Sequence, residues 1–164
     1  MQTSQRRCSR LWIGLNKTAN SIDKKALNKS LLDTDIFSEI LRAKNPAVIA
    51  RANAYFARFE CYTISAMTVM EIVQGWHRLQ RDDRISQFLD TIDTAEVLPM
   101  TIEVAELAGR MFGDLQRNGQ PIGVADTVIA ATAIESNLVL VTGNQAHYQR
   151  IQALNYDLII DNWR

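Results

Sequence analysis

The segment LLDTDIF at residues 31–37 constrains the fold more than any other part of the chain. A short apolar run ends abruptly at Asp33, and apolar residues resume at Ile36 with helical spacing. This pattern predicts a buried strand over residues 30–33 and a helix over about residues 35–43. Ligands of open α/β sheets bind outside the carboxyl ends of the strands, so Asp33 is expected in a binding crevice.

The rest of the chain repeats this alternation of strand and helix. Further strands are predicted at residues 61–64, 96–100, 138–141 and 156–160. Helices are predicted at residues 46–59, from residue 65 or 68 past residue 76, and at residues 82–93, 101–118 and 125–136. Alternating strands and helices predict a mostly parallel sheet that is covered by helices on both faces.

Length and charge divide the chain into a basic start and an acidic body. With 164 residues, the chain is long enough for one domain. Residues 1–29 hold seven basic residues and one acid, 7 − 1 = +6, while residues 30–164 hold 11 basic and 17 acidic residues, 11 − 17 = −6. We interpret residues 1–29 as a disordered leader or an upstream start, and residues 30–164 as the domain. A basic arm is also a nucleic-acid or partner signal.

Other composition features favour the cytoplasm. No apolar run approaches the roughly 18 residues of a membrane span, so no membrane association is expected. Cys8 and Cys61 lie far apart and show no metal-type spacing, which fits a reducing compartment.

Four polar residues fall where parallel strands end or where helices should be apolar: Asp33, Glu71, Asp126 and Asn144. Carboxylates gathered at one sheet edge would repel one another unless a hard cation neutralised them. Mg²⁺ and Mn²⁺ prefer oxygen ligands and retain several waters, so a few carboxylates suffice to hold them. We therefore predict a divalent-metal site built from Asp33, Glu71 and Asp126.

Each of these residues also has a purely structural interpretation. Asp33 can cap a helix, and Asp126 can offset the helix dipole from a first turn. Glu71 can be a solvated residue or a partner of Arg78, and Asn144 can be a turn former. The coincidence of all four at one predicted edge is what favours a site.

Four segments together resemble the PIN-domain ribonucleases, and specifically the VapC-type toxins of bacterial toxin–antitoxin pairs. They are LLDTDIFSEIL, TISAMTVMEIVQG, GQPIGVADTVIAATA and LVLVTGNQAHYQRI, and they follow the order of that family. The likeness covers about residues 30–164. The resemblance implies a three-layer α/β/α fold and Mg²⁺-dependent cleavage of RNA, with Mn²⁺ as a substitute. It also implies a small cognate antitoxin, a homodimer and a toxin–antitoxin hetero-oligomer.

The resemblance also assigns roles to individual residues. Asp33, Glu71 and Asp126 match the family's first three acids, and Asn144 matches its strand-end asparagine. Asp33, Glu71 and Asp126 would hold Mg²⁺, and metal-activated water would attack an RNA phosphodiester bond. Asn144 would orient a carboxylate or the attacking water. The fourth acid of many members is replaced here by His147, which favours a single metal ion. Basic groups for RNA are expected among Arg42, Lys44 and Arg78.

Two alternatives remain open at this point. One is a phosphatase of the haloacid-dehalogenase type, in which Asp33 would be the nucleophile and Asp35 the acid–base group. The lysine-free stretch at residues 120–148 argues against it. The other is a catalytically silent PIN-like module that binds a partner, which the presence of His147 allows.

Overall fold

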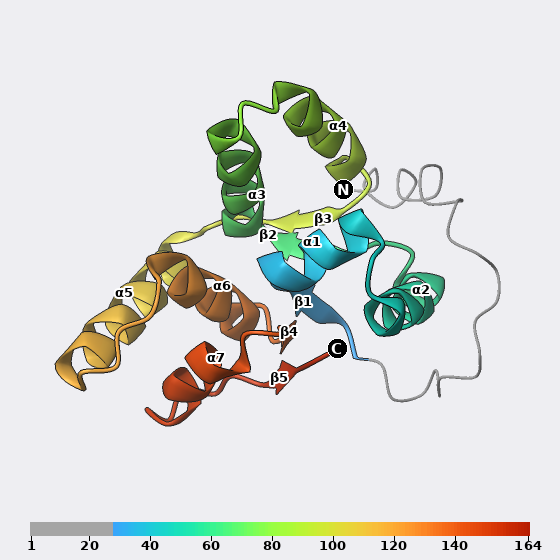
Figure 1. Ribbon diagram of the computed structural model, residues 1–164. Helices are drawn as coiled ribbons and strands as arrows, with labels where there is room; N and C mark the ends of the chain where they lie inside the picture. The colour runs from blue at the N-terminus through green and yellow to red at the C-terminus, as the bar shows by residue number, and fades with distance from the viewer. Residues whose placement is uncertain (1–27) are drawn as a thin grey trace.

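The computed structural model describes residues 28–164 of the chain. Nearly all of the basic leader predicted at residues 1–29 lies outside the described residues. Figure 1 shows a central sheet with helices on both faces, and α3 and α4 together form an arm above the sheet. Within residues 28–164, no helix combines the length and the apolar character that crossing a membrane would need.

Strands and helices alternate along the described chain as the sequence predicts. The strands are β1 (Ser30–Leu32), β2 (Thr63–Ser65), β3 (Glu96–Leu98), β4 (Val139–Val141) and β5 (Ile160–Asp161). The helices are α1 (Thr34–Arg42), α2 (Pro46–Phe59), α3 (Ala66–Arg78), α4 (Asp82–Ile92), α5 (Ile102–Arg117), α6 (Val124–Glu135) and α7 (Gln145–Gln152).

The sheet is parallel throughout, with the strand order β3-β2-β1-β4-β5. The chain adds strands on one side of β1 and then crosses over to add β4 and β5 on the other side. The order therefore reverses between β1 and β4. Ligand crevices of open parallel sheets form at such a reversal, beyond the carboxyl ends of the strands. Asp33 follows β1, and Thr142 follows β4, at this point.

Two hydrophobic clusters hold the three layers together. Leu31 and Leu140, which are partners in the β1–β4 register, pack with buried residues of α5, α6 and α7. Leu32 and Val141 point to the other face and pack with buried residues of α1, α2, α3 and α4. Alternate residues of each strand thus enter opposite clusters, as the pleat requires. The predicted three-layer α/β/α class is confirmed.

Two elements near the C-terminus differ most from the sequence prediction. Residues 145–152 form helix α7, although QAHYQRIQ is polar and was expected only to follow a turn. The last strand covers two residues, Ile160–Asp161, instead of residues 156–160. It is an edge strand that pairs only with β4, so one neighbour limits its length.

Candidate metal centre

Asp33 lies at the strand-order reversal and is 5% exposed. One carboxylate oxygen accepts a 2.7 Å hydrogen bond from the backbone N–H of Thr34, so Asp33 is the N-cap of α1. The other oxygen accepts a 2.7 Å bond from the hydroxyl group of Thr142, at the end of β4. Burial raises the pKa of Asp33 to about 6, and the bond from Thr142 opposes this rise.

Glu71 reaches the same edge from α3. Its carboxylate accepts a short hydrogen bond from the hydroxyl group of Thr34, the residue directly after Asp33. The side chain is half-buried in the second turn of a helix that Ser65 caps. An ion pair with Arg78, the structural alternative for Glu71, is not formed within the described residues.

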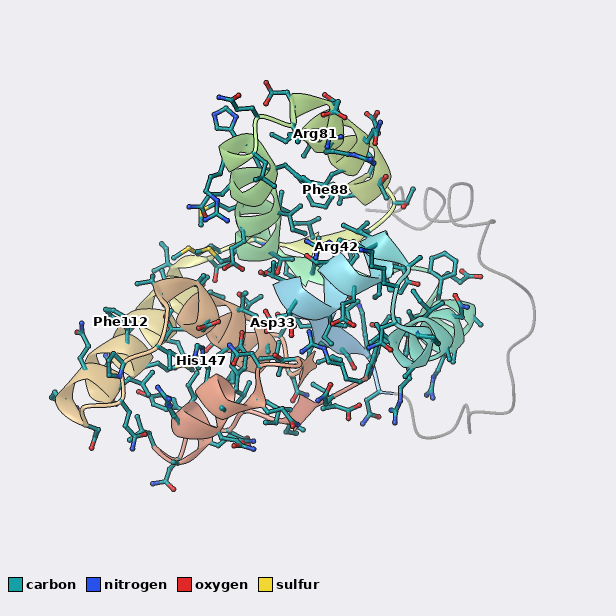
Figure 2. All side chains as sticks on the ribbon, viewed as in Figure 1. Asp33, Arg42, Arg81, Phe88, Phe112 and His147 are labelled. Atoms are coloured by element: carbon teal, nitrogen blue, oxygen red, sulfur yellow. The ribbon has the colours of Figure 1, made fainter. Side chains whose placement is uncertain are left out.

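Asp126 and Asn144 are joined through His147. Asp126 lies in the first turn of α6, where its carboxylate accepts a 3.2 Å bond from the N–H of Gly123. Nδ1 of His147 lies 2.9 Å from that carboxylate and 2.8 Å from the amide nitrogen of Asn144. This nitrogen either donates to Asp126 or accepts from Asn144, depending on its proton. In Figure 2, Asp33 lies between α1 and α6 near the middle of the molecule, and His147 lies toward α7.

Close polar contacts connect all four predicted residues, and Nδ1 of His147 makes one of its two contacts as a hydrogen bond at a time. The backbone N–H of Asn144 donates to the Thr142 hydroxyl oxygen at 2.9 Å, and that hydroxyl group donates to Asp33. The links along the network are Glu71–Thr34, Thr34–Asp33, Asp33–Thr142, Thr142–Asn144, Asn144–His147 and His147–Asp126. Residues up to 109 positions apart therefore meet at one rim of the sheet.

Sequence reasoning missed Tyr148, which lies under this rim. Its side chain is fully buried, and its hydroxyl group has no partner in good hydrogen-bond geometry within the described residues. Burial, followed by the negative charges of Asp33 and Asp126, raises the pKa of Tyr148 well above its usual value. A predicted helix over residues 145–152 would have placed Tyr148 on its buried face, but the sequence prediction omitted this helix.

The donor set at this rim suits a hydrated hard cation. In the described part of the chain, no three His, Cys, Asp or Glu side chains are arranged to hold a metal ion directly. Mg²⁺ needs only one or two direct carboxylates and keeps several waters, so this arrangement still fits it. A water on such an ion would also give the orphaned hydroxyl group of Tyr148 a partner. Ligation by Asp33, Glu71 and Asp126 stays a prediction.

Asp35 pairs with groups outside the candidate metal site. Its carboxylate accepts a 3.0 Å bond from the N–H of Gly143 and a 2.8 Å bond from the guanidinium group of Arg164. Arg164 also bonds Glu39 at 2.7 Å, which ties the C-terminus to α1. The phosphatase alternative needs Asp35 free as an acid–base group, and this pairing leaves it no such freedom.

Comparisons with known proteins identify the family of this chain. The family model described as PIN domain matches residues 30–153. The tRNA(fMet)-specific endonuclease VapC of Shigella flexneri is 31% identical over 130 residues, which cover 77% of this chain and 94% of the relative. Ribonuclease VapC2 of Haemophilus influenzae (strain ATCC 51907 / DSM 11121 / KW20 / Rd) is 26% identical and covers 82% of this chain and 98% of its own length.

Solved structures give the same result. The crystal structure of DNA-bound VapBC from Salmonella typhimurium superposes with a TM-score of 0.70 at 28% identity, covering 84% of this chain and all of that chain. The PIN domain model covers most of the described residues, and the relatives cover more than three quarters of the chain. The chain therefore belongs to the PIN domain family, among its VapC-type nucleases.

Proposed function

We propose that this protein is a Mg²⁺-dependent endoribonuclease that acts in the cytoplasm as the toxin of a toxin–antitoxin pair. Mn²⁺ is expected to substitute for Mg²⁺. The observation that carries the proposal is the network at the strand-order reversal, which joins three carboxylates from α3, α6 and the end of β1. Two relatives that match more than three quarters of this chain are named tRNA(fMet)-specific endonuclease VapC, and this supports the choice of RNA as substrate.

In this proposal, each residue of the network has one task. Asp33 and Asp126 are the direct ligands, and Glu71 acts through water from its bond with Thr34. When bound, Mg²⁺ supplies an activated water and offsets the negative charge that develops on the phosphoryl group. Thr142 fixes the rotamer of Asp33 with its 2.7 Å bond, and Asn144 orients His147 beside Asp126. These supports keep the carboxylates in place before substrate arrives.

The antitoxin is part of the same proposal. The solved relatives include VapBC complexes from Salmonella typhimurium and Haemophilus influenzae, which contain a toxin and its partner. We expect a small cognate antitoxin to block the site of this chain, and a homodimer within a toxin–antitoxin hetero-oligomer.

The test uses the purified full chain, free of antitoxin, with structured and unstructured RNAs, including initiator tRNA. Cleavage is measured with Mg²⁺, with EDTA and for Asp33→Asn. The matched control is Asp157→Asn, because Asp157 is exposed and lies near Asn28 and Lys29 at the opposite end of the strands. Mn²⁺ binding, followed by electron paramagnetic resonance, gives a readout that does not depend on activity.

We expect cleavage by the wild type and Asp157→Asn only with divalent metal, and loss of cleavage and tight Mn²⁺ binding in Asp33→Asn. Cleavage that survives both EDTA and Asp33→Asn would contradict the metal mechanism. Absence of both metal binding and cleavage would instead support a silent partner-binding module. Growth arrest on expression, relieved by a neighbouring antitoxin gene, would support the toxin role.

A further inference from the structure

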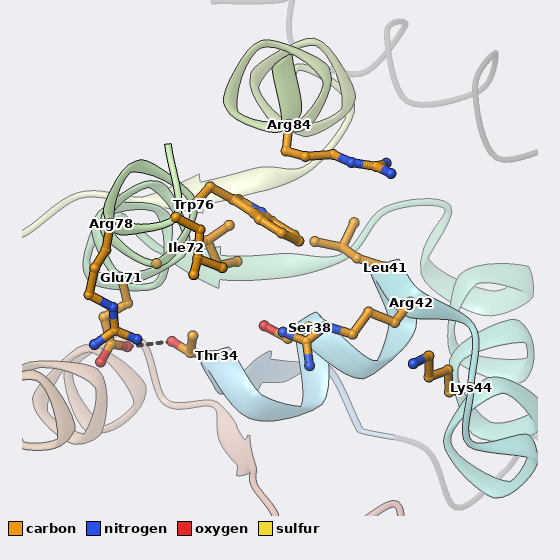
Figure 3. A pocket seen from close by; sticks show the side chains of 12 residues that line it. Thr34, Ser38, Leu41, Arg42, Lys44, Glu71, Ile72, Trp76, Arg78 and Arg84 are labelled. Atoms are coloured by element: carbon orange, nitrogen blue, oxygen red, sulfur yellow. Dashed lines mark hydrogen bonds between the residues drawn. The ribbon is translucent and has the colours of Figure 1, made fainter. Parts of the chain in front are cut away.

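A groove opens beside the candidate metal centre, between α1, α3 and α4. Its volume is about 490 Å³, and Thr34 and Glu71, which belong to the network, line one end of it. From there it extends past Trp76 of α3 toward Lys44, which follows α1 (Figure 3). The groove and the carboxylate site therefore form one continuous surface.

Uncompensated positive charge sets this groove apart from the rest of the domain. Four cations line it, namely Arg42, Lys44, Arg78 and Arg84, against the single acid Glu71. Arg42, Lys44 and Arg78 are exposed and have no hydrogen-bond or ion-pair partner within residues 28–164. Every other lysine or arginine of that range has such a partner or a ring contact.

This distribution is the reverse of the average charge of the domain, which is −6 over residues 30–164. Charges that stabilised the fold would be paired, as the other cations are. Unpaired cations that converge on a groove instead fit a polyanion, whose phosphates would release counterions on binding. In the view of Figure 3, Arg78 lies at the Glu71 end, Lys44 at the other end, and Arg42 between them.

The wall of the groove adds an aromatic surface. Trp76 is half-buried, and its indole group lines the groove next to Leu41 and Ile72 (Figure 3). Sites for single-stranded nucleic acids combine a basic groove along the backbone with aromatic rings on which bases stack. A duplex keeps its bases stacked on each other and would leave this ring unused.

We propose that this groove binds a single-stranded RNA segment that flanks the bond to be cut. Phosphates of the segment contact Arg78, Arg42 and Lys44, and one base stacks on Trp76. The inference rests on the proposed function, and it adds where the strand lies and why unpaired RNA is preferred. An amphipathic protein segment is the other class of occupant, and the test below separates the two.

The test measures binding of a short fluorescent single-stranded RNA by anisotropy in EDTA, where metal-dependent cleavage cannot occur. We expect Arg42→Gln and Arg78→Gln each to weaken binding about five- to tenfold and to lower the slope of log K against log salt by about 0.7. The matched controls are Arg110→Gln and Arg117→Gln, which remove exposed cations paired on α5 and should leave binding unchanged.

The role of the ring is tested separately. We expect Trp76→Ala to weaken binding about tenfold and Trp76→Phe to restore most of it. RNA should quench wild-type tryptophan fluorescence, and this quenching should be lost in Trp76→Phe. A duplex of the same sequence should bind more weakly than the single strand. Circular dichroism checks that each variant is folded.

Several outcomes would overturn the inference. In the first, the groove variants bind RNA like the wild type. In the second, a duplex binds as well as the single strand. In the third, the groove variants keep RNA binding and lose only a co-purifying protein partner, which would make a protein segment the occupant. RNA binding is measured without metal, so it does not depend on cleavage. Failure of the proposed nuclease activity can therefore be told apart from failure of the groove proposal. A protein that binds RNA through the groove but never cleaves it would contradict the proposed function and support the groove.

Discussion

The hydroxyl group of Thr142 donates a 2.7 Å hydrogen bond to the buried carboxylate of Asp33, across 109 residues of sequence. The two residues follow the central strands β4 and β1, at the point where the strand order reverses. The same Thr142 oxygen accepts the backbone N–H of Asn144, so it links the start of α7 to the first strand. This one side chain therefore couples the fold of the sheet to the position of a candidate ligand.

Replacing Thr142 by valine removes this bond at nearly constant shape. We expect the free energy of unfolding to fall by about 2 kcal/mol at pH 8, because a buried carboxylate loses a donor. The bond lowers the pKa of Asp33, so its loss should raise that pKa further above 6. The loss in the free energy of unfolding should be smaller at pH 5, where Asp33 of the folded protein is mostly protonated. Urea unfolding at both pH values measures this.

The matched control is Thr132→Val. Thr132 is also buried, but its hydroxyl group donates to the carbonyl group of Val128 within α6, where no titrating group takes part. Its effect should be the same at pH 5 and pH 8. An equal pH response of both variants would show that Thr142 does not act through Asp33.

Asp33 itself should cost stability when it is ionised. Burial raises its pKa from 3.8 to about 6, so the folded protein holds the proton more tightly than the unfolded chain. Stability from this group is fully present below about pH 4 and is lost as pH rises to 6, a change of ~3 kcal/mol at most. In EDTA at pH 8, the free energy of unfolding of Asp33→Asn should therefore exceed that of the wild type by about 1–3 kcal/mol. Urea unfolding measures this difference.

This advantage of Asp33→Asn should fade between pH 6 and pH 4. Asp157→Asn, at an exposed position, should show no comparable gain. Adding Mg²⁺ should stabilise the wild type and not Asp33→Asn, since only the carboxylate is expected to bind the ion. A less stable Asp33→Asn at pH 8 in EDTA would mean that its two accepted hydrogen bonds outweigh the cost of burying the charge.

Most of the architecture was predictable because local signals and the fold agree. The helix starts predicted at residues 46 and 101 are confirmed, with Pro46 at the start of α2 and Thr101 as the cap of α5. Of the two starts predicted for α3, residue 65 or 68, the structure has Ser65 as the cap. The helix α7 was missed because it begins at Asn144 without a side-chain cap bond and carries few apolar residues. It is held by tertiary contacts of Tyr148 and Ile151, which sequence periodicity does not reveal.

The site shows a different limit. Each carboxylate had a structural alternative to the ligand role, a helix cap for Asp33 and a first-turn acid for Asp126, and the structure shows both structural roles. Either position fixes the carboxylate at a helix start without using all its lone pairs, so the structural role and the ligand role are compatible. The contact of Arg164 with Asp35, 129 residues apart, could not be read from spacing because no local pattern encodes it.

That contact explains why residue 143 is glycine. A Cβ atom there would lie 2.0 Å from a guanidinium nitrogen of Arg164 and 2.6 Å from the carboxylate of Asp35. Gly143→Ala should displace the Arg164 side chain and leave Asp35 and Glu39, both partly buried, without their cation. We expect a loss of about 1–2 kcal/mol in the free energy of unfolding at pH 7.

A double-mutant cycle checks this cause. If Gly143→Ala acts by displacing Arg164, then Arg164→Ala should cost a similar amount and the double variant little more than either. Gly113→Ala in α5 is the matched control, because its Cβ would meet nothing within 4 Å and a helical alanine should add about 0.5–1 kcal/mol. Additive losses in the double variant would contradict a shared mechanism.

The imidazole group of His147 should limit the site to one metal ion. By the sequence resemblance, it stands in place of a fourth acid, and its Nδ1 lies 2.9 Å from Asp126. His147→Asp would place a second carboxylate against Asp126. In EDTA, their repulsion should lower the thermal midpoint, and saturating Mn²⁺ should more than restore it.

Electron paramagnetic resonance should then count about one Mn²⁺ per wild-type chain and more than one for His147→Asp. The matched control is His77→Asp, because His77 is exposed on α3 and its partner Asp82 lies outside the network. It should change neither the count nor the response of the midpoint to Mn²⁺. A wild-type chain that already binds two ions would contradict the limiting role of His147, since an imidazole group would then serve as well as the missing acid.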